Sequence, residues 1–469
     1  MNTKISLDEI TSFTKRRSFI FPSSEIYGGL AGVYDYGHYG VLLKNNIQNS
    51  WWKNMVLDRD DVVGLDSAIF MHPTTWKASG HLDCFNEALI DCRNCKFRMS
   101  ANHLLEKFEI NTDQMPLDEI NRHIEQLKTE NKLKCQNCGS DNLTGARQVN
   151  QLIRTNFGQP TLEPKDMTMD NYVYPRGETC QGIYLNYKNV IDTMRVKLPF
   201  GIAQAGKAFR NEIVARQFIF RTREFEQMEM QYFLSPEIMD EKFNYWKEER
   251  WNWYKEELGI PEAKLKWKKH DKLAHYAKEA YDLQYDFACL DGFNEVEGVH
   301  QRGDWDLSRH SEFSGQNLDY FDQKNNKRFT PHIMETSVGL NRLVLAVIDN
   351  AYTVEDLGEG KTRTVLKILP KLAPIKVAVF PLQKDEKLKG LASDIYHKLK
   401  KEMTTEFDDS GNIGKMYRRQ DEIGTPFCIT VDYECLEDNK VTIRTRDTMQ
   451  QERVPVNELV CLIKEKLAV

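Results

Sequence analysis

The chain has 469 residues, of which 41% are hydrophobic and 29% charged, and this allows two or three globular domains with sizeable cores. Its formal net charge of -6 excludes a globally basic nucleic-acid-binding protein, so a nucleic acid would have to be held by a local basic face. The sequence contains no apolar run as long as a membrane span, no signal-peptide pattern at its polar start, and too few cysteines for a disulfide scaffold. We therefore expect a cytoplasmic protein without a membrane partner.

The first 150 residues predict a helix, a strand and an inserted segment. Residues 38–55 are expected to be helical because apolar side chains recur at four-residue steps. The run Ser67–Pro73 predicts a strand that ends at its proline, which cannot continue a ladder. Residues 85–150 are polar and carry a Cys-x-x-Cys pair at each end, so we interpret them as an insertion. The apolar stripe of the helix consists of Leu43, Ile47, Trp51 and Met55.

The middle of the chain predicts strands followed by a long helix. A strand-like run occurs at 182–187, and two further strands joined by a charged loop are expected around Arg210 and Phe225. A helix is then expected from Ser235, which can cap it, to Gly259. The buried face of this helix is predicted to comprise Met239, Phe243, Trp246 and Trp253.

Beyond about residue 370 the sequence alternates between strand-like and helical segments. This alternation predicts a small α/β domain of about a hundred residues. The expected strands are 375–380, 426–432 and 441–446, and the expected helices are 393–403 and 456–466.

The segment 206–233 combines arginines with carboxylates. On a strand, Arg210 and Glu212 would point to the same face, and so would Arg221 and Arg223. A cation-lined pocket beside carboxylates suits a polyphosphate with its divalent cation, since arginine matches phosphate oxygens with two parallel hydrogen bonds. The alternative is an exposed strand with surface salt bridges, which the periodicity alone favours.

The segment 331–342 places small and polar residues before an apolar helix at 340–348. Arg342 would lie in the first turn of that helix, where backbone amides already favour anions. A turn before an ordinary core helix would show the same Gly-x-x-Arg pattern, so this motif taken alone is a weak signal.

Two Cys-x-x-Cys pairs could supply four thiolates to one tetrahedral zinc ion. Such a zinc would be structural, because four thiolates leave no open coordination position. The stretch between the pairs is longer than in a compact zinc ribbon, so four unligated thiols remain the alternative. The four residues are Cys92, Cys95, Cys135 and Cys138.

Taken in order, Phe-Arg-x-Glu at 209–212, the strand 225–233 and Gly-x-x-Arg at 339–342 resemble motifs 2 and 3 of the class II aminoacyl-tRNA synthetases. The helix at 38–55 with Pro73 resembles motif 1 of that family. Further segments are similar to its homodimeric glycyl-tRNA synthetases of the bacterial and eukaryotic α2 type, and the resemblance covers nearly the whole chain. These segments are 34–37, 76–81, 176–182 and 225–229.

The resemblance implies an α+β fold in which an antiparallel class II sheet is flanked by helices. It also implies a zinc-type insertion, a C-terminal α/β anticodon-binding domain and a homodimer formed through motif 1. Motifs 1, 2 and 3 would span about 38–73, about 200–233 and about 331–348. The catalytic domain would comprise 1–84 and 151–370, the insertion 85–150, and the anticodon-binding domain 371–469.

For ATP, the resemblance implies three catalytic residues, Arg210, Glu212 and Arg342. Arg210 would bind the α-phosphate and the substrate carboxylate, and Glu212 would hold the adenine amino group. Phe225 and Arg342 would stack on opposite faces of the adenine, and Glu295 would help to hold ATP and its magnesium ion. The whole expected ATP-binding set is Arg210, Asn211, Glu212, Phe220, Arg221, Thr222, Arg223, Glu224, Phe225, Glu295, Val296, Gly339, Leu340, Asn341 and Arg342.

For glycine, the resemblance implies a pocket of carboxylates around the ammonium group, supported by Arg302. The expected set is Glu178, Phe225, Glu226, Gln227, Met228, Glu229, Arg302, Glu335, Ser337 and Gly339, with Arg98 added from a loop that departs from the family pattern. In the C-terminal domain, Lys415, Arg418 and Arg419 would contact tRNA phosphates and Tyr417 would stack on a base. A solvated charged turn is the alternative for these four residues.

The implied activity is ATP-dependent ligation of glycine to tRNA(Gly) through glycyl-adenylate. Both reactants of the first step are anions, so positioning and positive charge matter more than a general base. Two alternatives stay open: the same chemistry with alanine, serine or threonine, and a synthetase-like binding protein that has lost catalysis.

Overall fold

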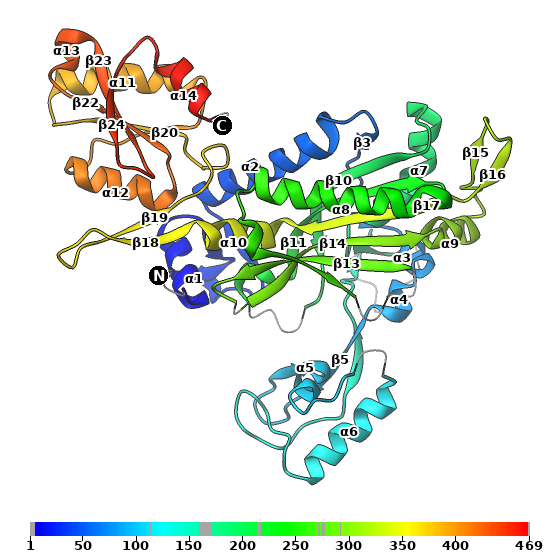
Figure 1. Cartoon of the computed structure of the whole chain (residues 1–469). Helices are drawn as coiled ribbons and strands as arrows, with labels where there is room; N and C mark the ends of the chain where they lie inside the picture. The colour runs from blue at the N-terminus through cyan, green and yellow to red at the C-terminus, as the bar shows by residue number, and fades with distance from the viewer. Residues whose placement is uncertain are drawn as a thin grey trace.

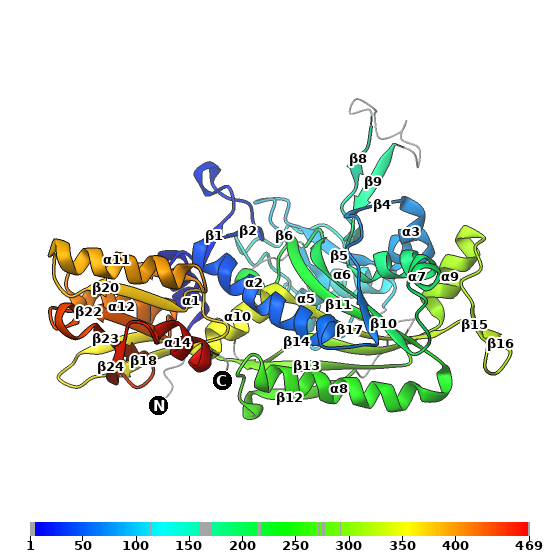
Figure 2. The ribbon, with the colours of Figure 1, turned by 90° about the horizontal axis from the view of Figure 1, so that it is seen from above.

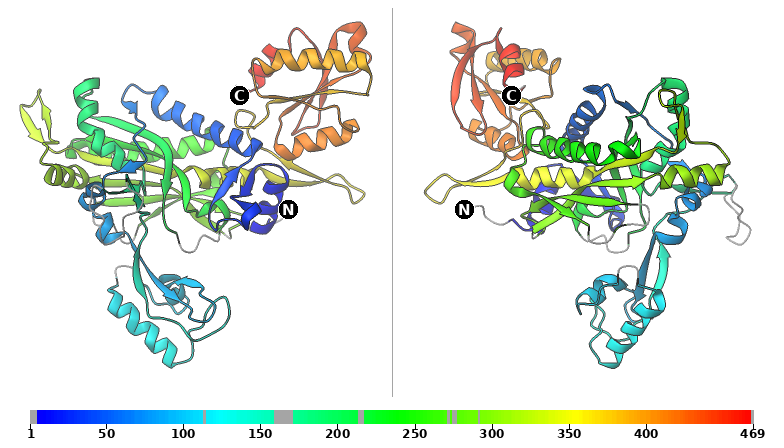
Figure 3. Two further views of the ribbon diagram at one scale, coloured as in Figure 1. Left: turned by 180° about the vertical axis from the view of Figure 1, so that it is seen from behind. Right: turned by 45° about the vertical axis from the view of Figure 1, so that its right-hand side comes forward.

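The computed structural model describes residues 5–112, 115–158, 171–212, 217–270, 273, 277–290 and 292–467. Figure 1 shows a central body built on a large sheet, an arm that projects from the body, and a C-terminal α/β unit that lies beside the body. The two further directions of Figure 3 show that a narrow pair of chain segments joins the arm to the body.

The body is organised around a seven-stranded sheet in the order β12-β13-β14-β17-β11-β10-β3. Neighbouring strands are antiparallel except for β10 and β3, which run parallel. The expected pair of strands on either side of the charged loop is confirmed as β10 and β11. The strands are β3 (Val62–Gly64), β10 (Phe200–Phe209), β11 (Glu224–Leu234), β12 (Leu265–Lys269), β13 (Glu279–Phe287), β14 (Gly292–Gly303) and β17 (His332–Gly339).

One face of this sheet is apolar and packs against three helices. Met228 and Met230 of β11 are fully buried in one hydrophobic cluster with Leu43 and Trp246. The three helices are α2 (His38–Trp52), α8 (Met239–Glu256) and α10 (Leu340–Ala351). They confirm the helices expected at 38–55, 235–259 and 340–348, although a 3-10 turn precedes α8 and the Ser235 side chain makes no capping hydrogen bond.

The opposite face carries polar residues that alternate with the apolar ones along β11. Gln227, Glu229 and Gln231 are buried on this face. Two helices, α7 (Cys180–Met194) and α9 (Trp305–Ser314), cover part of it, and the Tyr184 hydroxyl of α7 donates to Gln231 Oε1 at 2.7 Å. The remaining part of the face forms the cavity described below.

One strand expected from the sequence is wrong, and another is shorter than expected. Residues 182–187 lie inside α7, because Ile183, Tyr184 and Tyr187 are buried at helical spacing against the sheet. In the run 67–73 only β4 (Phe70–Met71) is a strand, and Pro73 opens a helix instead of ending a ladder. Proline suits a first helical turn, where its missing N–H is not needed.

The remaining elements of the body are short. They are α1 (Leu7–Arg16), β1 (Ile20–Pro22), β2 (Tyr34–Tyr36), α3 (Pro73–Ala78), α4 (His81–Cys84), β8 (Thr155–Asn156), β9 (Tyr172–Pro175), β15 (Tyr320–Asp322), β16 (Lys327–Phe329), β18 (Tyr352–Asp356) and β19 (Thr362–Leu366).

The arm, defined as residues 85–150, has its own hydrophobic cluster, which includes Ile90, Leu105 and Ile124. A three-stranded antiparallel sheet in the order β6-β5-β7 carries two helices. These elements are β5 (Asn86–Asp91), β6 (Arg98–Ser100), α5 (Ala101–Glu106), α6 (Leu117–Thr129) and β7 (Arg147–Asn150).

The C-terminal unit is a five-stranded sheet in the order β21-β20-β22-β23-β24, which confirms the expected α/β alternation. Its elements are β20 (Val377–Pro381), α11 (Glu386–Lys400), β21 (Thr405–Phe407), α12 (Ile413–Ile423), β22 (Phe427–Val431), α13 (Cys435–Asp438), β23 (Lys440–Thr445), β24 (Gln451–Pro455) and α14 (Leu459–Leu467). A buried ion pair joins this unit to the body: Arg363 Nε of β19 donates to Asp421 Oδ2 of α12 at 2.8 Å.

Candidate active site

A cavity opens on the polar face of the sheet, where β11, β14 and β17 run side by side. Strand alternation brings Glu229 of β11 and both Glu335 and Ser337 of β17 to this face. In β14 a bulge lies between Glu297 and Glu295, which pair with Leu283 and Gln284 of β13. This bulge turns Glu295 toward the cavity as well. The cavity therefore collects side chains from three neighbouring strands.

Most of the expected ATP-binding and glycine-binding residues line this cavity. From the ATP set these are Arg210, Glu212, Phe220, Arg221, Thr222, Phe225, Glu295, Gly339, Asn341 and Arg342. From the glycine set these are Glu178, Phe225, Glu226, Gln227, Glu229, Arg302, Glu335, Ser337 and Gly339.

Several expected residues do not line it. Met228, Val296 and Leu340 are buried in the hydrophobic cluster on the other face of the sheet. Asn211, Arg223 and Glu224 lie just beside the cavity, where Arg223 Nε donates to the Glu212 carbonyl at 2.7 Å. Arg98 lies on β6 of the arm and pairs with Asp91 at 2.8 Å, so the structure does not bring it to the cavity.

Arg210 and Glu212 do not lie on a strand, contrary to the prediction, because β10 ends at Phe209. The shared face is therefore not what brings them together. Instead, the Arg210 amide donates to the Arg223 carbonyl at 2.9 Å, and Arg221 Nε donates to Glu212 Oε2 at 2.8 Å. These bonds fold the ends of the charged loop over the cavity.

Three carboxylates, Glu178, Glu229 and Glu335, form one wall of the cavity. Glu229 accepts hydrogen bonds from Thr179 Oγ1 at 2.7 Å and from Ser337 Oγ at 2.6 Å. Both donors are neutral hydroxyls. Glu229 is thus held in place by groups that do not cancel its charge.

The other two carboxylates have basic partners. The Glu335 carboxylate lies 3.2 Å from the Arg302 guanidinium and 2.7 Å from His300 Nδ1. The Glu178 carboxylate lies 3.2 Å from His81 Nε2. Arg302 is itself held by Asp306, at 2.8 Å from Nε and 3.0 Å from the second nitrogen. Such bidentate geometry fixes the guanidinium under the pocket.

These contacts separate the pKa values of the three carboxyl groups. Although burial opposes ionisation, Arg302 and His300 lower the pKa of Glu335 to about 2. In the same way His81 and Arg302 outweigh burial and hold the pKa of Glu178 well below its usual range. Burial, reinforced by the charges of Glu335 and Glu178, raises the pKa of Glu229 to about 7.

Positive charge gathers at the other end of the cavity. Arg210 Nε donates to the Gly177 carbonyl at 2.9 Å, and its guanidinium lies 5.3 Å from the centre of the Phe225 ring. Arg342 lies over the Phe220 ring at 4.5 Å and pairs with Glu295 at 3.1 Å. Arg342 chiefly lowers the pKa of Glu295, which keeps that carboxylate charged.

Asn341, the neighbour of Arg342, connects the start of α10 to β11. Its Oδ1 accepts the backbone N–H of Glu226 at 2.9 Å, so the start of α10 is fastened to β11. Because Asn341 is buried, this hydrogen bond is shielded from water. The cavity thus joins an acidic pocket to a cationic, ring-lined groove, and this arrangement can hold an ammonium group beside a polyphosphate.

Among the residues that the structure describes, sequence reasoning missed three that line the cavity: Ile219, Gly298 and His300. His300 had a usable signal, because it lies two residues before Arg302 and strand alternation places both on one face. Although burial opposes protonation, Glu335 raises the pKa of His300. Gly298 leaves room for this ring, since a Cβ there would lie 2.8 Å from His300 Nε2.

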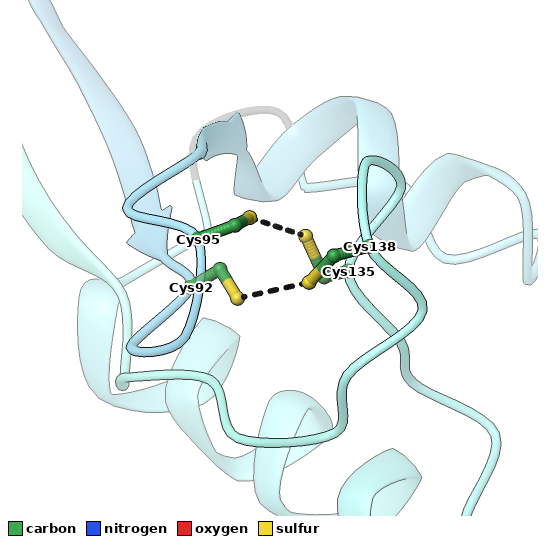
Figure 4. Close-up of side chains that lie close together, drawn as sticks. All are labelled: Cys92, Cys95, Cys135 and Cys138. Atoms are coloured by element: carbon green, nitrogen blue, oxygen red, sulfur yellow. Dashed lines mark hydrogen bonds between the residues drawn. The ribbon is translucent and has the colours of Figure 1, made fainter.

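The four predicted cysteines meet in the arm (Figure 4), although two separate turns supply them. Sγ of Cys92 lies 3.7 Å from that of Cys138, and Sγ of Cys95 lies 3.6 Å from that of Cys135. These separations are far too long for disulfides, whose sulfurs lie about 2.05 Å apart. They match four thiolates around one zinc ion at about 2.3 Å, which lie roughly 3.8 Å apart. The donor set therefore fits zinc.

The expected tRNA-contacting residues of α12 differ in their surroundings. Lys415 and Arg418 are exposed, whereas Arg419 Nε is bound to Asp408 at 2.9 Å. Tyr417 packs against Phe380, its ring lies 4.7 Å from the Arg444 guanidinium, and its hydroxyl is hydrogen-bonded to another side chain. Tyr417 is thus half-buried, and its stacking on a base stays a prediction. Within the described part of the chain, no helix is long and apolar enough to cross a membrane.

Comparison with known proteins places these features in a family. The description "tRNA synthetase class II core domain (G, H, P, S and T)" matches residues 165–351, and "Anticodon binding domain" matches residues 376–466. A glycine–tRNA ligase of Treponema denticola is 50% identical, with 99% of this chain and 98% of that protein covered. A glycine–tRNA ligase of Geobacillus kaustophilus is 46% identical, with 99% of each covered.

Among solved structures, a prolyl-tRNA synthetase of Cryptosporidium parvum superposes with a TM-score of 0.64 at 16% identity. The superposition covers 98% of this chain and 75% of the other. At this identity the likeness establishes a shared fold, and the curated relatives carry the information on activity.

Proposed function

This chain belongs to the family of glycine–tRNA ligases with a class II synthetase core, and from that membership we propose what its cavity does. The cavity joins glycine and ATP into glycyl-adenylate and pyrophosphate, and then transfers glycine to the 3′ end of tRNA(Gly). In the first step a carboxylate oxygen of glycine attacks the α-phosphorus, and the bond to the β-phosphate oxygen breaks. In the second step the terminal ribose hydroxyl attacks the carbonyl carbon and AMP leaves.

The observation that carries this proposal is the acidic pocket beside Arg210. Glycine offers no side chain, so an enzyme must recognise its ammonium group and its carboxylate. Glu178, Glu229 and Glu335 surround a position for the ammonium group, and Glu229 accepts hydrogen bonds from two neutral hydroxyls. Arg210 supplies the positive charge for the carboxylate and the α-phosphate. Any other amino acid would also need room for its side chain.

Rejection of alanine has to come from shape. One additional methyl in a roomy apolar pocket changes binding by only about 1–3 kcal/mol. The glycine end of this cavity is instead walled by fixed polar groups: Glu229 is held by Thr179 and Ser337, and Glu335 by Gln231 at 2.8 Å. A methyl group directed at this wall would displace hydrogen-bonded side chains rather than fill space.

The cationic groove suits ATP. Phe225 and Arg342 would hold the adenine between them, and Glu212 would accept from its amino group. Arg221 would reach the γ-phosphate once its bond to Glu212 is exchanged. Glu295, held charged beside Arg342, would hold the magnesium ion that ATP carries, and that ion would neutralise charge on the leaving pyrophosphate.

We assign residues 1–84 and 151–370 to catalysis, the arm to a zinc-stabilised tRNA contact, and residues 371–469 to anticodon binding. Exposed Lys415 and Arg418 of α12 are proposed to contact tRNA phosphates. Arg419, which Asp408 engages, would act mainly by shaping that surface.

We also propose a homodimer. Ile26 and Tyr27 are each 87% exposed and Leu30 is 56% exposed on the turn between β1 and β2. Figure 2 shows this turn projecting from the body. Large apolar side chains on a projecting turn favour a second copy as their partner. Sedimentation equilibrium should give twice the chain mass of 54.8 kDa.

The decisive test is amino-acid-dependent exchange of labelled pyrophosphate into ATP, without tRNA, across all twenty amino acids. We expect exchange with glycine alone. Strong exchange with another amino acid would keep the reaction and overturn the specificity. Silence with every amino acid, from folded protein supplied with magnesium, would favour a protein that binds without catalysis.

The raised pKa of Glu229 predicts how glycine use depends on pH. Below about pH 7 this carboxyl becomes neutral and no longer attracts the ammonium group, which itself stays charged. At saturating ATP, kcat/KM for glycine should fall toward about tenfold per pH unit on the acid side of pH 7. A flat profile between pH 7 and 5.5 would contradict this assignment.

The cysteine cluster predicts one zinc ion per chain. A Cys95→Ser, Cys138→Ser double variant should lose this zinc, as measured by elemental analysis. Charging of tRNA should then fall about tenfold or more, because the arm loses the contact that joins its two turns. Cys84→Ser, an exposed cysteine beside the arm, serves as the matched control and should keep the zinc. Unchanged zinc content in the double variant would contradict the assignment.

A further inference from the structure

The arm is joined to the body directly beside Arg210. The two residues at its root are Phe85, which precedes β5, and Gln151, which follows β7. The Gln151 amide donates to the Phe85 carbonyl at 2.9 Å, and the Asn211 amide donates to the Gln151 carbonyl at 2.7 Å. The backbone of the root is therefore hydrogen-bonded to the residue that follows Arg210.

Side chains make a second connection at the same place. The guanidinium of Arg210 lies 5.2 Å from the centre of the Phe85 ring and 5.3 Å from that of Phe225. One of these rings belongs to the sheet and the other to the root of the arm. Contacts of this kind are attractive and depend on the position of the ring. The place of Arg210 thus depends on where the root lies.

The root also reaches the acidic pocket. The Phe85 ring packs edge-on against His81 at 5.2 Å, and His81 Nε2 lies 3.2 Å from Glu178. The same ring therefore touches one residue that contacts the ammonium pocket and the arginine proposed for the α-phosphate. The arm beyond the root has its own hydrophobic cluster, so it can move as one body on its two strands.

We propose that Phe85 is a positioning residue for Arg210, and that the root transmits the position of the arm to the activation site. Occupancy of the arm by the acceptor end of tRNA then changes the rate of glycyl-adenylate formation. This inference rests on the proposed function. Its physical basis is that a displacement of about 1 Å at a group that orients the reacting atoms costs about a hundredfold in rate.

The first test compares three variants in glycine-dependent pyrophosphate exchange without tRNA. Phe85→Leu keeps an apolar side chain but removes the ring face, and kcat should fall about tenfold. Phe85→Tyr keeps the ring and should stay within about twofold of wild type. Phe108→Leu removes a ring from the cluster of the arm, away from the root, and should also stay near wild type. A wild-type kcat for Phe85→Leu would overturn the proposal.

The second test measures the coupling. A tRNA(Gly) transcript whose terminal ribose lacks both hydroxyls binds but cannot be charged. At saturation it should change the exchange rate of wild type by about twofold or more, and Phe85→Leu should bind it equally well by fluorescence anisotropy while showing no such change. An equal response in both proteins, or none in wild type, would overturn the coupling. Absence of glycine exchange by wild type alone would instead defeat the proposed function.

Discussion

Arg210→Met is expected to lower the rate of glycine-dependent pyrophosphate exchange by about 10²–10³-fold. This is the typical cost of removing one preorganised donor from the place where charge develops in a transition state. Arg210 is bound through Nε to the Gly177 carbonyl, which holds the guanidinium without neutralising it. The full charge is therefore available to the glycine carboxylate and the α-phosphate as they approach each other.

Single-turnover formation of glycyl-adenylate is the measurement that isolates this effect. Arg210→Lys keeps the charge but loses the planar fork, so it should recover only part of the rate. Arg122→Met, on an exposed position of α6, is the matched control and should exchange like wild type. If Arg210→Met exchanged within about threefold of wild type, Arg210 would have no role at the α-phosphate.

Glu229→Gln is expected to weaken glycine binding and to stabilise the fold at the same time. The loss in kcat/KM for glycine should be about 10–100-fold, because one charge-assisted contact to the ammonium group is removed. Above pH 7 the buried carboxylate is ionised at a cost to the fold, since its pKa is raised from 4.5 to about 7. The amide carries no charge, so unfolding at pH 8 should cost about 2–3 kcal/mol more than in wild type.

The pH dependence separates this effect from ordinary packing changes. Glu229 is protonated in the folded protein at pH 5, so the gain in stability of Glu229→Gln should nearly disappear there. Glu335→Gln is the matched contrast, because the pKa of Glu335 is lowered from 4.5 to about 2. The ionised carboxylate therefore stabilises the fold fully above pH 4.5, and this stabilisation is lost as the pH falls through about 2. That variant should be less stable at pH 8, by about 3 kcal/mol. Equal signs for the two variants would contradict the assigned charge states.

Residue patterns were sufficient where a local rule decides the structure. The apolar stripe of α2, the aromatic face of α8 and the alternation of the C-terminal unit each follow a single periodicity, and each is found as expected. Local rules failed where two periodicities compete. Residues 182–187 satisfy a strand pattern. However, Ile183, Tyr184 and Tyr187 can all pack against the sheet when the segment is a helix, because helical spacing places them on one side.

The candidate site divides in the same way. Motif order and spacing identified its arginines and carboxylates, because the chemistry of a polyphosphate and an amino acid demands those residue types. Spacing could not show that Glu295 reaches the cavity while Val296 joins the core, because the bulge in β14 decides this. Spacing does place His300 on the same face as Arg302, but it could not show the contact of His300 with Glu335, a residue on the neighbouring strand.

The sequence by itself determined the family and the reaction, and it singled out four cysteines as candidate zinc ligands, because these depend on residue type and order along the chain. Only the tertiary structure decided which of three nearby carboxylates have basic partners and which one accepts from two hydroxyls. It also decided that Tyr417 is half-buried against Phe380, and that the root of the arm lies against Arg210. The physical reason is that charge state, burial and contact depend on groups brought together from segments far apart in the sequence, and no local pattern records that proximity.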